Sequence, residues 1–343
     1  MKIKLKDIAE ALNLSQTTVS RALRSHPAIS EETRAAVFAQ AEKQGYQVSY
    51  THKGRKLHSK KASLNLLALV SGSASSDSDL QNVSGLTHET LKGISDVVNH
   101  FDARLIIDFV NPGCLSQMEL KEKCAAFDGI IFIHRFEEAQ VRAVSLKKPC
   151  VSADYTYLSA KADVVSGGDI DQFIFLIRHL GKLGHTRIGY LDFPGGYHPR
   201  GVRGYLGFRA GLMEAGLEDN PAFHLLNGNF PDEEAKLAKA VELTEKRLVD
   251  VWVCGNDYAA MDLLEQFSRH GISVPDDISV TGFGGIHFPG TNLKLCSFRT
   301  PFEQIGQEAA KFLFDRIRFP GIPTRHAFID CVFTEGNSVK CLK

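Results

Sequence analysis

The chain has 343 residues, of which 43% are hydrophobic and 23% charged, a composition typical of a globular protein with two or three domains. Its 40 basic and 40 acidic residues cancel, so the overall charge identifies no partner. Apolar runs fall far short of the ~20 residues of a membrane helix, and the polar start lacks a secretory signal. Seven cysteines without a CxxC pair favour reduced thiols over a disulfide scaffold or a structural zinc site. We therefore expect a cytoplasmic protein without a membrane segment.

The charge is unevenly distributed along the chain. Residues 1–62 hold twelve Lys and Arg against five Asp and Glu, whereas the remaining residues hold 28 against 35. A basic head joined to an acidic body indicates a polyanion as the partner of the head. A basic tail that only aids solubility would give the same balance, so charge alone leaves both interpretations open.

The start of the chain predicts three short helices. Apolar residues recur at helical spacing from Leu5 to Leu12 and again from Val19 to Leu23, with a short turn between the two runs. Ser15 and Ser30 precede the second and third helices, as N-cap residues do. Residues 47–62 are polar and basic, which is typical of a linker.

From Leu64 onward, apolar strands alternate with amphipathic helices. This order is typical of parallel sheets with helices on both faces, and about 280 residues is large for one such sheet, so we expect two lobes. The predicted strands are Leu64–Val70, Arg104–Phe109, Gly129–Ile133, Cys150–Ala153, Arg187–Leu191, His224–Leu226, Asp250–Cys254 and Ser279–Phe283. The predicted helices span residues 87–99, 116–126, 170–183, 202–215, 233–247, 258–270 and 302–318.

The sequence carries no familiar enzyme signature. It has no P-loop, no nucleophile elbow and no H-E-x-x-H motif. Gly282–Gly285 lacks the third glycine of a dinucleotide loop, and His179 and His185 have no carboxylate or cysteine at metal-ligand spacing. We expect no catalytic residues, no metal and no cofactor. An enzyme on an α/β scaffold would have only fold-level support.

The segment from Lys6 to Leu23 predicts a helix, a tight turn and a second helix. Hydroxyl and amide side chains at the start of a helix suit DNA phosphates and base edges, and an arginine one turn later can bind a guanine through two hydrogen bonds. The alternative is a polar surface helix on a generic three-helix bundle. The polar residues that the second helix would expose are Gln16, Thr17, Ser20 and Arg21.

Residues 3–46 resemble the DNA-binding head of the LacI/GalR (lactose-repressor) family of bacterial transcriptional regulators. The resemblance continues through the body in family order and covers nearly the whole chain. The matching segments of the head are Lys6–Ala9, Thr18–Leu23, Ile29–Arg34 and Gly45–Tyr46. Those of the body are Phe127–Ile131, Leu183–Ile188, Gly207–Phe208, Asn256–Asp257, Val274–Phe283 and Arg299–Pro301.

The resemblance implies an N-terminal all-α helix-turn-helix head and an α/β two-lobed body with parallel sheets, like the periplasmic binding proteins. The implied domains are the head (1–46), the linker or hinge (47–62) and the effector-binding and dimerisation domain (63–343). The lobes of the last would comprise residues 63–160 with 289–320, and residues 161–288 with 321–343. The implied function is a regulator, in this family most often a repressor, whose affinity for operator DNA is set by a small effector.

The partners follow from the same resemblance. We expect a pseudo-palindromic operator in double-stranded DNA, a carbohydrate effector and a homodimer. The tail from Glu335 to Lys343 has no leucine heptad of the kind that tetrameric relatives append, so we expect no tetramer.

The resemblance also implies roles for individual residues. In the head, bases would be read by Gln16, Thr17 and Arg21, and phosphates would be contacted or oriented by Ser15, Thr18, Ser20, Ser30 and Thr33. In the body, we expect the effector to bind between the lobes with Asp257 as its principal polar anchor. Asp154 would approach it from the other lobe, and Arg203 and Phe230 would flank it as a donor and a stacking surface. The two aspartates follow apolar strands, at the carboxyl ends where open α/β sheets bind ligands. The alternative role for Asp257 is to cap the helix that follows it.

The sequence departs from the family in the linker and in the effector site. Val48 and Ser49 replace a proline and an asparagine, so a hinge helix that inserts into the minor groove is not established. Gly204 replaces the family's effector-binding arginine, and Gly284–Gly285 replaces an acidic pair. The altered linker leaves a second function open, a soluble sugar-binding sensor whose operator binding is weakened or lost.

Overall fold

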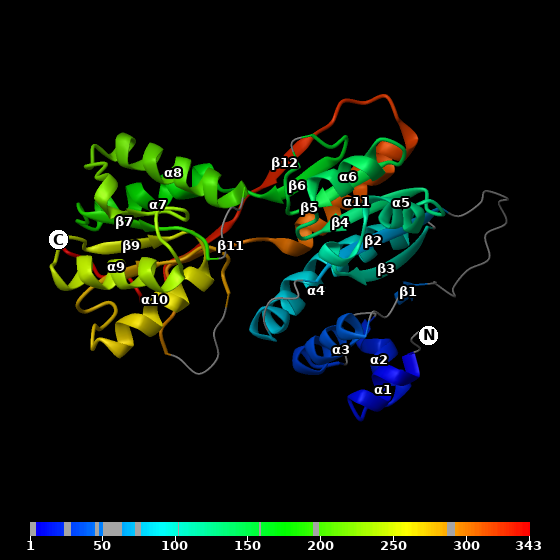
Figure 1. Cartoon of the computed structure of the whole chain (residues 1–343), viewed down its shortest axis with the longest axis horizontal. Coiled ribbons are helices and arrows are strands. Elements are labelled where there is room, and N and C mark those ends of the chain that lie inside the picture. Colours follow the sequence, from blue (N-terminus) through cyan, green and yellow to red (C-terminus); the bar gives the residue numbers. More distant parts are fainter. Residues whose placement is uncertain are drawn as a thin grey trace. The chain divides into compact units, whose positions relative to one another are not determined.

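The structure is a computed structural model that describes residues 5–23, 29–44, 48–50, 64–72, 77–101, 103–157, 159–194, 199–286 and 292–343 (Figure 1). The chain divides into two compact units. Unit 1 comprises Met1–Ser166 and Phe302–Ile329, and unit 2 comprises Gly167–Pro301 and Asp330–Lys343. The chain therefore passes between the units at residues 166, 301 and 329, each later than the lobe boundaries predicted at 160, 288 and 320.

The head lies at the start of unit 1 and consists of three helices. They are α1 (Leu5–Ala11), α2 (Gln16–Leu23) and α3 (Glu31–Lys43). Ile8, Val19, Leu23 and Phe38 are almost completely buried between them, which accounts for the helical spacing of these apolar residues. Asn13, with φ of 52°, makes the turn between α1 and α2. The three predicted helices are confirmed.

The rest of unit 1 is built on one mostly parallel sheet with the strand order β1-β3-β2-β4-β5-β6-β12. Its strands are β1 (Val48–Tyr50), β2 (Asn65–Ser71), β3 (Arg104–Val110), β4 (Gly129–Ile133), β5 (Cys150–Ala153), β6 (Asp163–Gly167) and β12 (His326–Ile329). Its helices are α4 (Asp77–His100), α5 (Gln117–Cys124), α6 (Glu138–Ser145) and α11 (Phe302–Arg318). All five residues of β4 are buried, as expected for a central parallel strand covered on both faces.

Only a short part of the predicted linker lies within the described residues. Val48–Tyr50 forms β1, which pairs antiparallel with the edge of β3 from Leu105 to Ile107. The other residues of the 47–62 segment lie outside the described part of the chain.

Unit 2 contains a parallel sheet with the strand order β10-β9-β7-β8 and a separate antiparallel pair, β11-β13. The strands are β7 (Ile188–Leu191), β8 (His224–Leu225), β9 (Val251–Cys254), β10 (Ser279–Thr281), β11 (Ser297–Arg299) and β13 (Val332–Thr334). The helices are α7 (Ile170–Lys182), α8 (Pro199–Ala215), α9 (Glu233–Glu245) and α10 (Asp257–Arg269). Trp252 of β9 is fully buried, and its indole N–H donates to the Thr244 hydroxyl (2.9 Å). The predicted class, a helical head and an α/β body with parallel sheets, is confirmed.

The described residues contain neither a membrane-spanning helix nor a metal-binding cluster of side chains. None of the helices they contain is both long and apolar enough to cross a membrane. No group of three or more His, Cys, Asp or Glu side chains among them could hold a metal ion.

Candidate DNA-binding surface and effector site

Two serines fix the starts of the helices in the head. The Ser15 hydroxyl accepts a hydrogen bond from the Thr18 amide (2.9 Å), and the Ser30 hydroxyl accepts one from the Thr33 amide (3.3 Å). These are N-cap bonds, which satisfy amides that have no partner inside the helix. Each serine also forms a hydroxyl–hydroxyl bond of 2.8 Å with the same threonine. The four side chains thus order the first turns of α2 and α3.

The outer face of α2 carries the residues predicted to read bases. Gln16, Thr17 and Arg21 are exposed, and Ser20 is half-buried. Val19, Ala22 and Leu23 on the opposite face are buried. Packing and polar contacts are therefore separated on this helix, which can enter a major groove without disturbing the core of the head.

Two neighbouring strands of unit 1 are followed by residues in the left-handed region. His134 follows β4 with φ of 64°, and Asp154 follows β5 with φ of 76°. Because β4 and β5 pair in parallel, both residues lie at the same edge of the sheet. Non-glycine residues in this conformation store strain of about 1–3 kcal/mol each and gather at functional sites. The predicted Asp154 thus lies at an edge that carries a second candidate, His134.

His134 was not among the predicted residues. Its Nε2 atom lies 2.7 Å from the Thr87 hydroxyl of α4. Desolvation lowers the pKa of the imidazole, and the Asp154 carboxylate partly opposes that shift. The signal that could have found His134 is its position directly after an apolar strand, the same signal that identified Asp154.

Asp257 has a role that neither prediction described. The side chain that caps α10 is that of Asn256, which accepts from the Ala259 amide (2.8 Å). The Asp257 carboxylate is fully buried and accepts hydrogen bonds from the Ile286 amide (2.6 Å) and the Ser297 hydroxyl (2.8 Å). Burial raises the pKa of this carboxyl, and the hydrogen bonds from Ile286 and Ser297 act against the rise. Asp257 therefore ties the loop after β10 to the start of β11.

The loop that Asp257 holds contains two of the departures noted in the sequence. Gly284 and Gly285 have φ of 139° and 71°, a conformation that favours glycine. A Cβ atom on Gly285 would lie 2.5 Å from the Arg299 Cα atom. The acidic pair of the family is thus replaced by residues that let the backbone pass close to β11.

Arg203 and Phe230 also lie in unit 2, where Arg203 pairs with another residue of the protein. The Arg203 Nε–H group lies 2.9 and 2.7 Å from the two carboxylate oxygens of Asp169, which caps α7 by accepting from the Ile170 amide. Phe230 is half-buried against the hydrophobic cluster around β9 and α10. Of the four predicted effector residues, three lie in unit 2 and Asp154 lies in unit 1.

A side chain does not fit without a shift at Gly204, the position of the family's effector-binding arginine, but Arg200 lies on the same helix. A Cβ atom on Gly204 would lie 2.8 Å from the Phe173 ring. Arg200, one helical turn earlier on α8, has its guanidinium 5.3 Å from the centre of the Phe283 ring and 3.4 Å from the Thr300 hydroxyl. The i, i+4 spacing from Gly204 places Arg200 on the same side of the helix, and this spacing is the signal that sequence reasoning missed.

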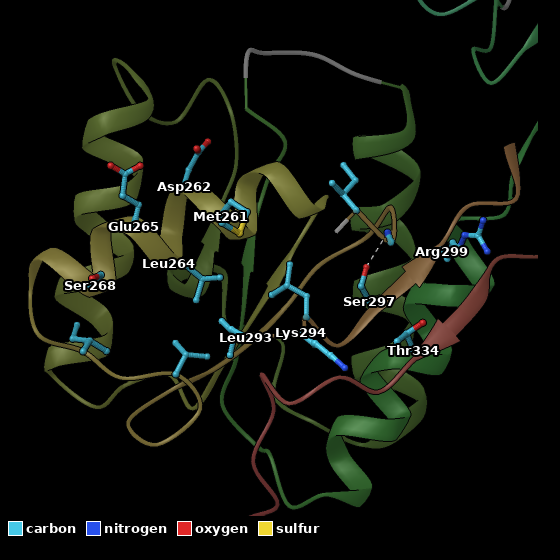
Figure 2. Close-up of a pocket in the computed structure, with 15 residues that line it drawn as sticks. Met261, Asp262, Leu264, Glu265, Ser268, Leu293, Lys294, Ser297, Arg299 and Thr334 are labelled. Atoms are coloured by element: carbon cyan, nitrogen blue, oxygen red, sulfur yellow. Dashed lines mark hydrogen bonds between the residues drawn. The ribbon is translucent and has the colours of Figure 1, made fainter. Parts of the chain in front are cut away.

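A separate pocket of about 780 Å³ lies in unit 2 beside α10 (Figure 2). Leu264 of α10 lies beside Leu293 in this pocket, which Met261 and Leu295 also line, and two acidic residues of the same helix, Asp262 and Glu265, lie at its edge. Its volume is in the range of small-molecule pockets. None of the four predicted effector residues lines it, although Ile286 and Ser297, the hydrogen-bond partners of Asp257, do.

Two family models match separate parts of the chain. Residues 4–49 match the family described as bacterial regulatory proteins, lacI family. Residues 177–339 match the periplasmic binding protein-like domain.

Curated relatives match over almost the full length. The chain is 26% identical to the HTH-type transcriptional regulator MalR of Streptomyces coelicolor, over 95% of this chain and 93% of that protein. It is 24% identical to the HTH-type transcriptional repressor PurR of Photobacterium profundum, over 92% of both chains. It is also 24% identical to the probable HTH-type transcriptional repressor ExuR of Bacillus subtilis, over 99% of both.

Solved structures share the fold. A complex of the transcriptional regulator CelR with cellobiose has a TM-score of 0.65 at 19% identity, over 98% of this chain and 100% of that one. A LacI family regulator from Enterococcus faecium with bound ribose has a TM-score of 0.63 at 20% identity, over 81% of this chain and 100% of that one. The chain therefore combines a helix-turn-helix head of the lacI family with a periplasmic binding protein-like domain and is a transcriptional regulator.

Proposed function

We propose that this regulator is a homodimeric repressor that binds a pseudo-palindromic operator and whose operator affinity is changed by a carbohydrate effector. The observation that carries the DNA-binding part is the exposed polar face of α2 on a helix whose other face is packed. The names of the PurR and ExuR relatives support repression as the sign of regulation.

Individual contacts in the head follow from its geometry. Gln16, Thr17 and Arg21 read base edges, because they are exposed on α2 and carry donors and acceptors. Ser15, Thr18, Ser30 and Thr33 order the helix starts, whose amides face a phosphate. Ser20 contacts the DNA backbone beside them.

The effector is proposed to be a sugar or a sugar derivative. Neighbouring structures were solved with cellobiose and with ribose bound, which supports this chemical class. Asp154 is the direct contact, since a carboxylate can accept hydrogen bonds from two adjacent hydroxyl groups. Arg203 and Phe230 contribute a donor and a stacking surface. Asp257 acts indirectly, by holding the loop that contains Phe283 and Gly284.

DNA binding is tested by a gel shift of the full-length protein with fragments of its own genome. A retarded fragment that is released by Gln16→Ala supports the proposal. If no fragment is retarded while the protein binds a sugar, the second function, a sensor without operator binding, is correct instead.

Effector binding is tested by a thermal-shift screen of sugars, because a ligand that binds only the native state raises its melting temperature. A sugar that raises the melting temperature should lose this effect in Asp154→Asn and keep it in Asp171→Asn, an exposed carboxylate on α7 that serves as the matched control. An unchanged shift in Asp154→Asn would exclude Asp154 from the site. Sedimentation equilibrium at micromolar concentration tests the dimer, and a stable tetramer would contradict it.

A further inference from the structure

The head is packed against the body of unit 1 through one face of α3. The Arg34 guanidinium of α3 lies 3.0 Å from Nε2 of His88 on α4, and the rings of Phe38 and His88 are 5.4 Å apart. The same guanidinium donates to the Ile29 carbonyl of the head (2.8 Å), so it bridges the two parts. His88 is thus a residue of the body that contacts both Arg34 and Phe38 of the head.

The backbone supplies a second connection. Directly after the head, Val48–Tyr50 adds an antiparallel strand to the edge of β3. A strand added in this way is held by main-chain hydrogen bonds. The head is therefore connected to unit 1 by a helix contact and a strand contact.

The helix that carries His88, α4, also contacts α11, the helix that begins where the chain crosses from unit 2 into unit 1. One turn after His88, the Lys92 ammonium lies 2.5 Å from the Glu303 carboxylate of α11. A Cβ atom on Gly306 would lie 2.1 Å from the Thr90 carbonyl oxygen, so α4 and α11 are in backbone contact. α11 begins at Phe302, where the chain enters unit 1 from unit 2. A movement of the chain at residue 301 would shift Glu303 and, through its ion pair with Lys92, would pull on α4.

The contact between Arg34 of the head and His88 of α4 leaves one polar atom of each side chain without a hydrogen bond. Arg34 Nε and His88 Nδ1 are buried, and neither has a hydrogen-bond partner among the described residues. Unpaired buried donors and acceptors weaken an interface, which favours a reversible contact over a permanent one. Docking does not cover the DNA-reading face, because Gln16, Thr17 and Arg21 remain exposed with the head in place.

We propose that the head docks reversibly on α4 through Arg34, Phe38 and His88, and that Lys92 and Glu303 connect this docking surface to the crossover at the start of α11. The docked head and the released head are two states of the regulator, and a change at the crossover shifts the balance between them. The effect on operator binding rests on the proposed function, whereas the docking and its connection to α11 do not.

Hydrogen exchange of the full-length protein without DNA or sugar tests the docking. His88→Arg places a fixed positive charge beside Arg34 and Lys92, and it should speed exchange in α3 about tenfold or more. His88→Glu pairs with Arg34 and should keep the wild-type rate or slow it. His100→Arg, an exposed position on the same helix, is the matched control and should change nothing. Amides of β2 and β4 report whether the body remains folded in each variant.

The connection is tested in the same experiment at Lys92, which pairs with Glu303 of α11. Lys92→Ala should speed exchange in α3, although less than His88→Arg. Lys311→Ala removes an exposed pair with Glu308 on the far part of α11 and is its control. If α3 exchanges equally in the wild type and in His88→Arg while β2 and β4 stay protected, the docking is wrong. If only Lys92→Ala is silent, the connection to α11 is wrong and the docking stands. Failure of the gel shift described above would leave both results unaffected.

Discussion

At the scale of single residues, the loop after β10 in unit 2 is held by the carboxylate of Asp257. Asp257 accepts hydrogen bonds from Ile286 and Ser297, and no other described carboxylate of unit 2 is as completely buried. Asp257 follows an apolar strand in the sequence, but no sequence pattern indicates that Ile286, 29 residues later, donates a hydrogen bond to it. Long-range hydrogen bonds of this kind have no local signal.

Removal of the Asp257 carboxylate should therefore destabilise the protein. Asp257→Ala leaves the Ile286 amide and the Ser297 hydroxyl without an acceptor, at a cost of about 1–3 kcal/mol for each partner. Asp257→Asn keeps one acceptor and should cost less. Urea unfolding followed by tryptophan fluorescence measures both, since Trp252 is in the core of the same unit. A cost as small as that of a surface substitution would contradict the assigned role.

The raised pKa of Asp257 also predicts a pH dependence. Because the folded state holds the proton more tightly than the unfolded state does, this carboxyl contributes most to stability below its ordinary pKa of 3.8. The contribution is lost as the pH rises through the higher folded pKa. The free energy of unfolding of the wild type, taken relative to Asp257→Asn, should thus increase as the pH falls. A difference independent of pH would contradict the shift.

His88 should make head docking sensitive to acid, with the opposite sign. Burial, with added repulsion from Arg34 and Lys92, lowers its pKa from 6.5 to about 4, while Glu303 opposes the shift. Protonation is thus disfavoured in the docked state, so docking is fully present above pH 6.5 and is lost as the pH falls toward 4. Exchange rates of α3, corrected for the intrinsic pH effect, measure this. His88→Gln should remove the pH step, and a step that persists in it would come from another group.

Two adjacent residues of the head should separate stability from recognition. Ser15→Ala removes the N-cap of α2 and should cost about 0.5–2 kcal/mol of head stability. Gln16→Ala should leave the melting temperature unchanged and weaken operator binding by about 1–3 kcal/mol at one base position per half-site. Calorimetry and a gel shift distinguish these effects. The assignment fails if Gln16→Ala lowers the melting temperature as much as Ser15→Ala does.

At the scale of elements, periodicity predicted the central strands and most helices because their apolar residues are buried regularly. Gly129–Ile133 and Cys150–Ala153 were predicted with their observed bounds. The sequence did not predict β6, which begins with Asp163, a fully buried carboxylate paired with Arg316 and Arg325. Nor did it predict β12, whose residues are exposed or half-buried and lack a continuous apolar run. The ion-pair partners of Asp163 are more than 150 residues away in the sequence, and a local pattern cannot show them.

The contact between α4 and α11 predicts a position that tolerates no side chain. Gly306→Ala would place a Cβ atom 2.1 Å from the Thr90 carbonyl, so the helices must separate, at a typical overpacking cost of about 1–3 kcal/mol or more. Gly321→Ala is the control, because nothing lies within 4 Å of the added atom. Thermal unfolding of the two variants measures the difference. Equal stability of Gly306→Ala and Gly321→Ala would show that the helices are not in backbone contact.

At the scale of the whole molecule, the uneven charge and the two-unit body explain why the sequence revealed the class of protein more readily than its ligand. The basic surplus and the helix pattern both lie in the first 62 residues, where function depends on local structure. The candidate effector residues are spread over segments from both units, with Asp154 in one and Arg203 in the other. Their partners, such as Asp169 for Arg203, are set by the tertiary fold.

The most direct test of the central claim, DNA binding by the head, is a fluorescence-anisotropy titration of the full-length protein with the retarded operator fragment at increasing salt. If the two heads of a dimer neutralise about 6–10 phosphates, affinity should fall about 10³–10⁵-fold between 50 and 200 mM salt. Arg21→Ala should weaken binding at every salt concentration by about 1–3 kcal/mol while leaving the slope nearly unchanged, as expected for a base contact. An affinity that does not depend on salt, or that is equal for operator and scrambled DNA, would contradict the account.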